Sequence, residues 1–127
     1  MVSVFGLLDR YIGPAMKRAL AVELYEKGMS EEKIANILGV SRSLVSRYLK
    51  GNRGSHLEEL PRSLLEEIKF IAVEASSGKL QSSDIEYLLW VTALKYASRK
   101  KLCAFHAKID SKIDARTCQL CVKLFSS

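Results

Sequence analysis

The sequence predicts an all-α protein in which an N-terminal helix-turn-helix head is followed by a helical body. Three observations lead to this fold class. Apolar residues recur at helical spacing in successive segments, capping residues and glycines separate these segments, and no segment shows the apolar–polar alternation typical of a strand. The chain has 127 residues, of which 48% are hydrophobic, and it can therefore bury a core.

The first predicted helix begins at Pro14 and ends at Lys27 and Gly28. Proline suits the first position of a helix, because the N–H that it lacks would be unpaired there in any case. Glycine suits the residue that follows the last turn. Residues 1–12 are expected to form a short apolar arm or a first helical turn.

A pair of short helices follows, joined at Gly39. Ser30 is placed to cap the first helix, and Ser41 is placed to cap the second, which runs to Lys50. Ala35 lies where two such helices touch, and a larger side chain there would push them apart. Glycine at the turn accepts the positive φ that the turn requires. This spacing is typical of the DNA-binding helix-turn-helix.

The free face of the second helix carries the candidate DNA-binding residues. It holds only hydroxyl groups and cations, which suit phosphate oxygens and base edges. Residues 1–55 contain nine Lys or Arg against five Asp or Glu, and the chain as a whole has a formal charge of +6, so a polyanionic partner is favoured over a merely solvated face. The predicted DNA-binding residues are Ser41, Arg42, Ser43, Ser46, Arg47, Lys50 and Arg53.

Two glycines and an asparagine in residues 51–55 predict a linker. We therefore place a boundary there, between a helix-turn-helix DNA-binding domain at residues 1–54 and a helical body at residues 55–127. The body is expected to serve dimerisation or effector binding, and it includes a tail that contains cysteine and histidine.

Two helices are predicted in the body, and a capping box starts each of them: Ser63 with Glu66, and Ser83 with Glu86. The second helix is apolar around much of its circumference, Trp90 included, and should therefore be buried on two sides. Either it is the central helix of one chain, or its second side binds a partner chain.

Cysteine and histidine residues near the end of the chain show the spacing of metal ligands. A C-x2-H pair is followed after eleven residues by a C-x2-C pair, and three thiolates with one imidazole suit a structural zinc that would staple the tail to the body. An iron–sulfur centre is another option. Alternatively, the thiols are buried on one helix over residues 111–125, or two of them form a disulfide. The candidate ligands are Cys103, His106, Cys118 and Cys121.

Part of the sequence resembles a known family. Pro14 with the segment KRALAVEL after it, the helix pair, and the segment YLKGNRG are together similar to the archaeal family of short helix-turn-helix transcriptional regulators, with an XRE/Cro-like head. The resemblance covers residues 13–54, and the tail from Cys103 is similar to the cysteine-containing segment with which the family tends to end. It implies a transcription regulator.

The sequence thus predicts a sequence-specific regulator, a repressor, that binds double-stranded DNA as a homodimer. The alternative is an antitoxin-like or adaptor protein whose body binds a protein partner, with DNA binding for autoregulation. The sequence has no glycine-rich phosphate loop, no nucleophile beside a base and no paired carboxylates, so we expect no enzyme. No apolar run approaches the ~18 residues of a membrane span, and no secretory signal is recognisable, so we expect a cytoplasmic protein. A small-molecule effector is left open.

Overall fold

The computed structural model describes residues 2–126, which form helices and contain no strand, so the predicted all-α class is confirmed. None of the helices within this range is long and apolar enough to span a membrane. In chain order, the elements are α1 (Val4–Leu7), a π-helical turn (Leu8–Ile12), α2 (Gly13–Glu26), α3 (Glu31–Leu38), α4 (Arg42–Lys50), a 3₁₀ turn (Leu57–Glu59), α5 (Arg62–Ser76), α6 (Ser82–Ser98), α7 (Cys103–Ile109) and α8 (Leu120–Phe125).

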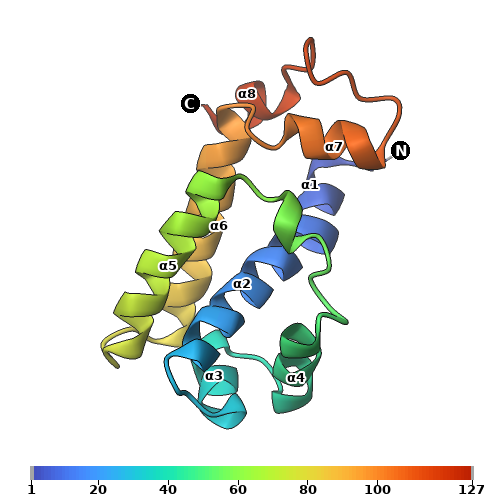
Figure 1. Cartoon of the computed structure of the whole chain (residues 1–127). Coiled ribbons are helices and arrows are strands. Elements are labelled where there is room, and N and C mark those ends of the chain that lie inside the picture. The colour runs from blue at the N-terminus through green and yellow to red at the C-terminus, as the bar shows by residue number, and fades with distance from the viewer. Residues whose placement is uncertain (1, 127) are drawn as a thin grey trace.

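The helices are arranged along one long axis (Figure 1). Helices α2, α5 and α6 run side by side and pack on one another. Helices α3 and α4 lie at one end of this group, whereas α7 and α8 lie at the other end, together with both ends of the chain. The helix-turn-helix pair is therefore far from the tail that contains cysteine and histidine.

Helix α2 begins at Gly13 with Pro14 in its first turn, as predicted, and helical structure already starts at Val4, where the sequence left open an arm or a first helical turn. Ser3 caps α1 by accepting a hydrogen bond from the Gly6 N–H at 2.9 Å. The π-helical turn, in which the Gly13 N–H donates to the Leu8 carbonyl, comes immediately before Pro14, so the proline ring is accommodated without ending the helix. The expected arm is thus part of one continuous helical segment with α2.

Gly13, the first residue of α2, also serves close packing. A Cβ atom at this position would lie 3.1 Å from the Trp90 ring and 3.0 Å from the Leu8 carbonyl oxygen. The indole Nε1–H of Trp90 donates to Glu86 at 2.7 Å, and the same carboxylate pairs with Lys17 of α2 at 3.3 Å. Trp90 therefore joins α6 to the N-terminal helix of its own chain.

Helix α6 packs on α2, α3, α5 and α8, so it is the central helix of one chain. Its N-terminal box is Gln81 with Asp84, where the Gln81 N–H donates to the carboxylate at 2.9 Å. The predicted box at Ser83 and Glu86 is therefore wrong by two residues, because Glu86 is engaged with Trp90. The predicted box at Ser63 and Glu66 is also absent: α5 begins after Pro61, with no side-chain cap.

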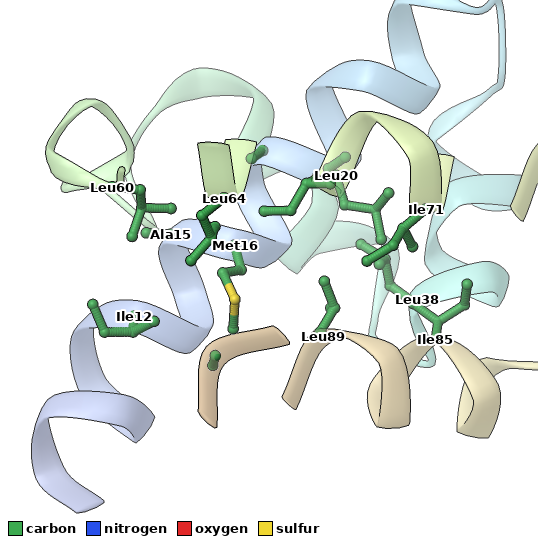
Figure 2. Close-up of a cluster of buried hydrophobic side chains, with 14 of the residues drawn as sticks. Ile12, Ala15, Met16, Leu20, Leu38, Leu60, Leu64, Ile71, Ile85 and Leu89 are labelled. Carbon is green, nitrogen blue, oxygen red and sulfur yellow. The ribbon is translucent and has the colours of Figure 1, made fainter. Parts of the chain in front are cut away.

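One hydrophobic cluster holds the molecule together (Figure 2). Each fully buried Leu or Ile contributes about 1.5–3 kcal/mol relative to an exposed one. The cluster takes side chains from both parts of the chain that the sequence separates at residue 54, so head and body share one core. Its labelled members are Ile12, Ala15, Met16, Leu20, Leu38, Leu60, Leu64, Ile71, Ile85 and Leu89.

The predicted linker packs tightly against α2. Gly54 is buried at a φ of +74°, and a Cβ atom there would lie 2.5 Å from the Pro14 carbonyl oxygen and 2.8 Å from the Arg18 Cβ. The guanidinium of Arg18 donates to the Gly54 carbonyl at 3.4 Å. The division into residues 1–54 and 55–127 stays a prediction, and the contacts of Gly54 hold the two parts in one arrangement.

We predict that Gly54→Ala lowers the free energy of unfolding by about 2 kcal/mol or more, because it combines an unfavourable φ with a clash against backbone. The matched control is Gly28→Ala. Gly28 also has a positive φ, +91°, but nothing lies within 4 Å of its Cβ position, so only the backbone cost of about 1 kcal/mol is expected. Urea denaturation of both variants measures the difference, and equal losses would contradict the close approach.

Candidate nucleic-acid interface

The helix pair α3 and α4 has the local structure that the sequence predicts. The Ser30 hydroxyl accepts the Lys33 N–H at 3.2 Å, and the Ser41 hydroxyl accepts the Leu44 N–H at 3.1 Å, so both helices are capped as expected. Gly39 ends α3 at a φ of +67°, the left-handed conformation that glycine adopts without strain.

Helix α4 is fixed by its apolar side against α2 and α3. Val45 and Tyr48 are buried there, whereas Leu44 and Leu49 are half-buried at the edges. Burial raises the pKa of Tyr48, and the nearby cations of Arg53 and Arg47 oppose this shift. Because this side is packed in the core, only the opposite side of α4 is free to bind a ligand.

The free side of α4 is cationic and unneutralised. Arg42, Arg47 and Lys50 are exposed, as is Arg53 after the helix. Within residues 2–126, none of these four cations forms an ion pair with a carboxylate. An exposed cation without an internal partner can bind a phosphate without first breaking an intramolecular contact.

The three predicted serines are placed differently from one another. Ser41 and Ser43 are exposed at the N-terminus of α4, with their hydroxyl oxygens 3.2 Å apart. A helix N-terminus of this kind, with hydroxyls beside free backbone N–H groups, suits an anion. Ser46 is half-buried. It lines a hollow on the surface together with Tyr25, Glu31, Leu49 and Lys50.

Arg53 occupies a separate place, at the junction of head and body. It lines a cavity of about 170 Å³ with Tyr48 of α4, Trp90 of α6, and Asp9 and Lys17 of the N-terminal helix. The sequence grouped Arg53 with the cations of α4, but the chain reverses after Gly51, which has a φ of +80°. Arg53 therefore lies at the inner border of the candidate interface.

Sequence reasoning missed Asn52, which it treated only as a breaker of helix. Asn52 is exposed, and its backbone N–H donates to the Arg47 carbonyl at 2.9 Å, which closes the C-terminal turn of α4. Its backbone is thereby held against the last turn of the helix, which carries Arg47 and Lys50. The dipeptide Gly51-Asn52 was the available signal, because a glycine after a helix sends the next residue back across its end.

The predicted metal ligands are only partly brought together. Cys103 begins α7, Cys121 lies in α8, and Cys118 lies in the turn before α8, so the helix expected over residues 111–125 is wrong. The thiols are close enough to influence one another electrostatically, and all three are free. His106 is buried instead at the N-terminus of the chain, with its Nε2 atom 2.7 Å from the Val2 carbonyl oxygen, to which it donates.

As arranged, these side chains do not form a metal site. Within residues 2–126, no group of three or more His, Cys, Asp and Glu side chains is placed to hold a metal ion. A zinc bound by Cys103, His106, Cys118 and Cys121 would need them to regroup, so zinc binding stays a prediction. Metal analysis of protein purified without chelator checks it, and about one zinc per chain is the expected result if the ligands do regroup.

The buried thiols should react slowly. Burial raises the pKa of Cys103, and burial together with Cys103 and Cys118 raises the pKa of Cys121 to about 11. Since the thiolate is the reactive species, we predict that Ellman's reagent modifies the half-buried Cys118 first in the native protein at pH 8. The control is unfolded protein, in which all three thiols should react at similar rates; equal rates in the folded protein would contradict the prediction.

His106 and a second buried polar residue, Asp110, hold the N-terminal backbone. One Asp110 carboxylate oxygen accepts the Val2 N–H at 2.7 Å, and the other accepts the Lys112 N–H at 3.0 Å. These backbone donors lower the pKa of Asp110 below its ordinary value of 3.8. The carboxylate and His106 thus tie α7 to the residues that precede α1.

A lowered pKa means that this contact stabilises the protein above about pH 3.8 and is lost as the pH falls through the folded-state value. We predict that Asp110→Ala lowers the melting temperature at pH 7, and that the difference from wild type shrinks below about pH 3.8. Thermal unfolding over a pH series measures this. The control is Asp114→Ala, which removes an exposed carboxylate near the same turn. If the melting temperatures of Asp110→Ala and wild type differed by the same amount at every pH, the role of Asp110 would be contradicted.

Comparison with known proteins supports the assignment of the N-terminal part. Residues 15–61 match the family model of the Homeodomain-like domain, and this range contains α3 and α4 with nearly all of α2. No curated protein and no solved structure gives a match to the chain. The matched range extends past residue 54 to residue 61, so it crosses the boundary predicted between the head and the body. Residues 15–61 are therefore similar to a helix-turn-helix domain of the homeodomain-like type.

Proposed function

We propose that the protein is a sequence-specific transcription regulator, a repressor, that inserts α4 into the major groove of double-stranded DNA and acts as a homodimer. The observation that carries this proposal is the outward side of α4. It is exposed, cationic and free of internal ion pairs, on a helix whose opposite side is packed into a helix-turn-helix domain.

The residues of α4 have distinct roles in this proposal. Its N-terminal half approaches the base edges, as in other helix-turn-helix proteins. Arg42 and Arg47 contact bases or phosphates, and an arginine that binds a guanine with two hydrogen bonds gives about 1–3 kcal/mol of discrimination. Ser41 and Ser43 donate from the helix N-terminus. Lys50 and Arg53 contact the DNA backbone. Ser46, which lies in its hollow, reads the DNA at shorter range.

Two copies are needed because one small head contacts too few bases to be selective in a genome. A dimer that reads two half-sites about 34 Å apart, one turn of DNA, doubles the contacts on the same face of the duplex. Occupation of such a site near a promoter would block transcription. We also propose that the protein is archaeal and that its helix-turn-helix is of the XRE/Cro-like type.

The contribution of α4 can be tested with two alanine variants. Selection from a random-sequence duplex pool first supplies the operator. We predict that Arg47→Ala weakens operator binding by about 10-fold or more and relaxes sequence preference, since it removes a base contact. Lys50→Ala should weaken binding to all sequences alike and reduce the salt slope by about one unit.

Mobility-shift or anisotropy titrations over a range of salt concentrations measure both effects. The control is Lys79→Ala, which removes an exposed cation from the turn between α5 and α6 and should leave binding almost unchanged. If both α4 variants bind the operator like wild type, α4 is not the reading helix.

A further inference from the structure

The outer surface of α5 and α6 exposes large apolar side chains that the core does not use. Phe70 is 71% exposed and Val73 is 52% exposed on α5, while Tyr87 is 67% exposed and Val91 is 43% exposed on α6. Single exposed apolar residues are common, but several on two packed helices mark an interaction surface. We call these four residues the α5–α6 surface.

An ion pair between the helices places Phe70 of α5 and Val91 of α6 on one surface. Lys95 of α6 pairs with Glu67 of α5. Phe70 follows Glu67 by three residues, and Val91 precedes Lys95 by four, so each lies one turn along the same side of its helix. Because α5 and α6 run antiparallel, these turns lie next to each other (Figure 1).

Charges of opposite sign flank the apolar stripe of α5. Arg62 and Lys69 line a cavity together with Ala19 and Glu23 of α2, which places both cations on the α2 side of the stripe; Glu66 lines the same cavity and pairs with Lys69 at 3.7 Å. Glu67 pairs with α6, and Glu74 lies two turns further along the same side, which makes that side acidic. The stripe at Phe70 and Val73 thus separates an edge that holds Arg62 and Lys69 from an edge that holds Glu67 and Glu74, although Lys69 and Glu67 each also have a partner within the chain.

We propose that the α5–α6 surface binds a second copy of this chain, with the two α5 helices parallel about a two-fold axis that runs along them. Phe70 and Val73 then occupy the two apolar positions of a heptad, with Lys69 before them and Glu74 after them. In a parallel pair, a cation at such a position meets the acidic residue five positions later on the partner helix. Lys69 meets the partner's Glu74, and Arg62 meets the partner's Glu67.

The same charges disfavour an antiparallel pair of α5 helices. In that arrangement each edge of α5 would face the identical edge of the partner helix, which would place cations against cations. The heptad positions before Phe70 and after Val73 hold the polar residues Glu66 and Ser77. The apolar contact is therefore centred on the middle of α5, and Tyr87 and Val91 of α6 must widen it.

The parallel arrangement also suits the proposed function, on which this inference rests. Helices α3 and α4 lie at one end of the long axis that α5 follows (Figure 1). A two-fold axis along α5 brings the α4 helices of both copies to the same end, where they can face one DNA duplex. An antiparallel pair would place them at opposite ends.

The first test is the molar mass of the full chain by size-exclusion chromatography with light scattering. Wild type should be a dimer, and Phe70→Glu should weaken dimerisation by about 30-fold or more, because it buries a charge at the centre of the interface. Tyr25→Glu, which changes an exposed aromatic residue at the end of α2, should remain dimeric. A monomeric wild type, or a Phe70→Glu variant that stays as dimeric as wild type, would overturn the proposal.

Charge reversals test the orientation. Lys69→Glu and Glu74→Lys should each weaken the dimer, because each leaves like charges facing one another, and the double variant Lys69→Glu/Glu74→Lys should restore it. The control for added charge is Lys79→Glu, outside the surface. Circular dichroism checks that each variant is folded. Failure of the double variant to recover would exclude the parallel pairing.

DNA binding separates this inference from the proposed function. The probes are random-sequence duplexes of about 12 and about 30 base pairs, which admit one head and two heads, respectively. Wild type should bind the longer duplex more tightly than the shorter one, whereas Phe70→Glu should bind the shorter duplex like wild type and lose the gain on the longer. Dimerisation without any DNA binding would leave the surface in place and refute the regulator; tight binding to the longer duplex by a monomeric variant would refute the need for this surface.

Discussion

The structure depends on close packing against one side of the long N-terminal helical segment. Trp90 of α6 packs on Gly13, and the chain after α4 packs on Pro14 and Arg18 through Gly54. Both contacts need a position without a Cβ atom, since a side chain at either would meet backbone or ring atoms at about the limit of contact or closer. These two glycines fix the position of α6 on one side and the exit of α4 on the other. The head therefore has a defined orientation relative to the body.

That fixed orientation determines how the outward side of α4 can meet a ligand. A cationic helix on a flexible linker could bind polyanions in many poses, whereas one whose exit is buried against α2 presents Arg42, Arg47 and Lys50 in a single direction. The shared core makes the proposed dimer surface and the proposed DNA surface parts of one body (Figure 2). A two-fold contact along α5 would then set the distance between two α4 helices without further joints. In that proposed dimer, packing rather than linker length would set the spacing of the half-sites.

The tail has a structural role at the opposite end. His106 and Asp110 hold the backbone of Val2, and Phe125 of α8 packs edge-on against Phe5 of α1 at 6.3 Å between ring centroids. The two ends of the described chain are thus joined through α7 and α8, the helices that contain Cys103 and Cys121. Sequence spacing alone suggested metal ligands, because it cannot show that the histidine has a backbone carbonyl as its partner.

The sequence by itself determined the all-α class, the capped helix pair around Gly39 and the cationic side of α4, because these depend on local signals: apolar periodicity, hydroxyl caps and a glycine at the turn. It placed the start of α2 at Gly13 and Pro14, but it could not show that helical structure begins earlier, at Val4, or that Gly13 and Gly54 make room for neighbouring atoms. A glycine has the same letter whether it frees the backbone or makes room for a neighbour, and only the tertiary structure shows Trp90, Pro14 and Arg18 against these positions. The roles of His106 and Trp90, and the side of α5 left without a partner, were likewise decided by contacts between residues far apart in the chain.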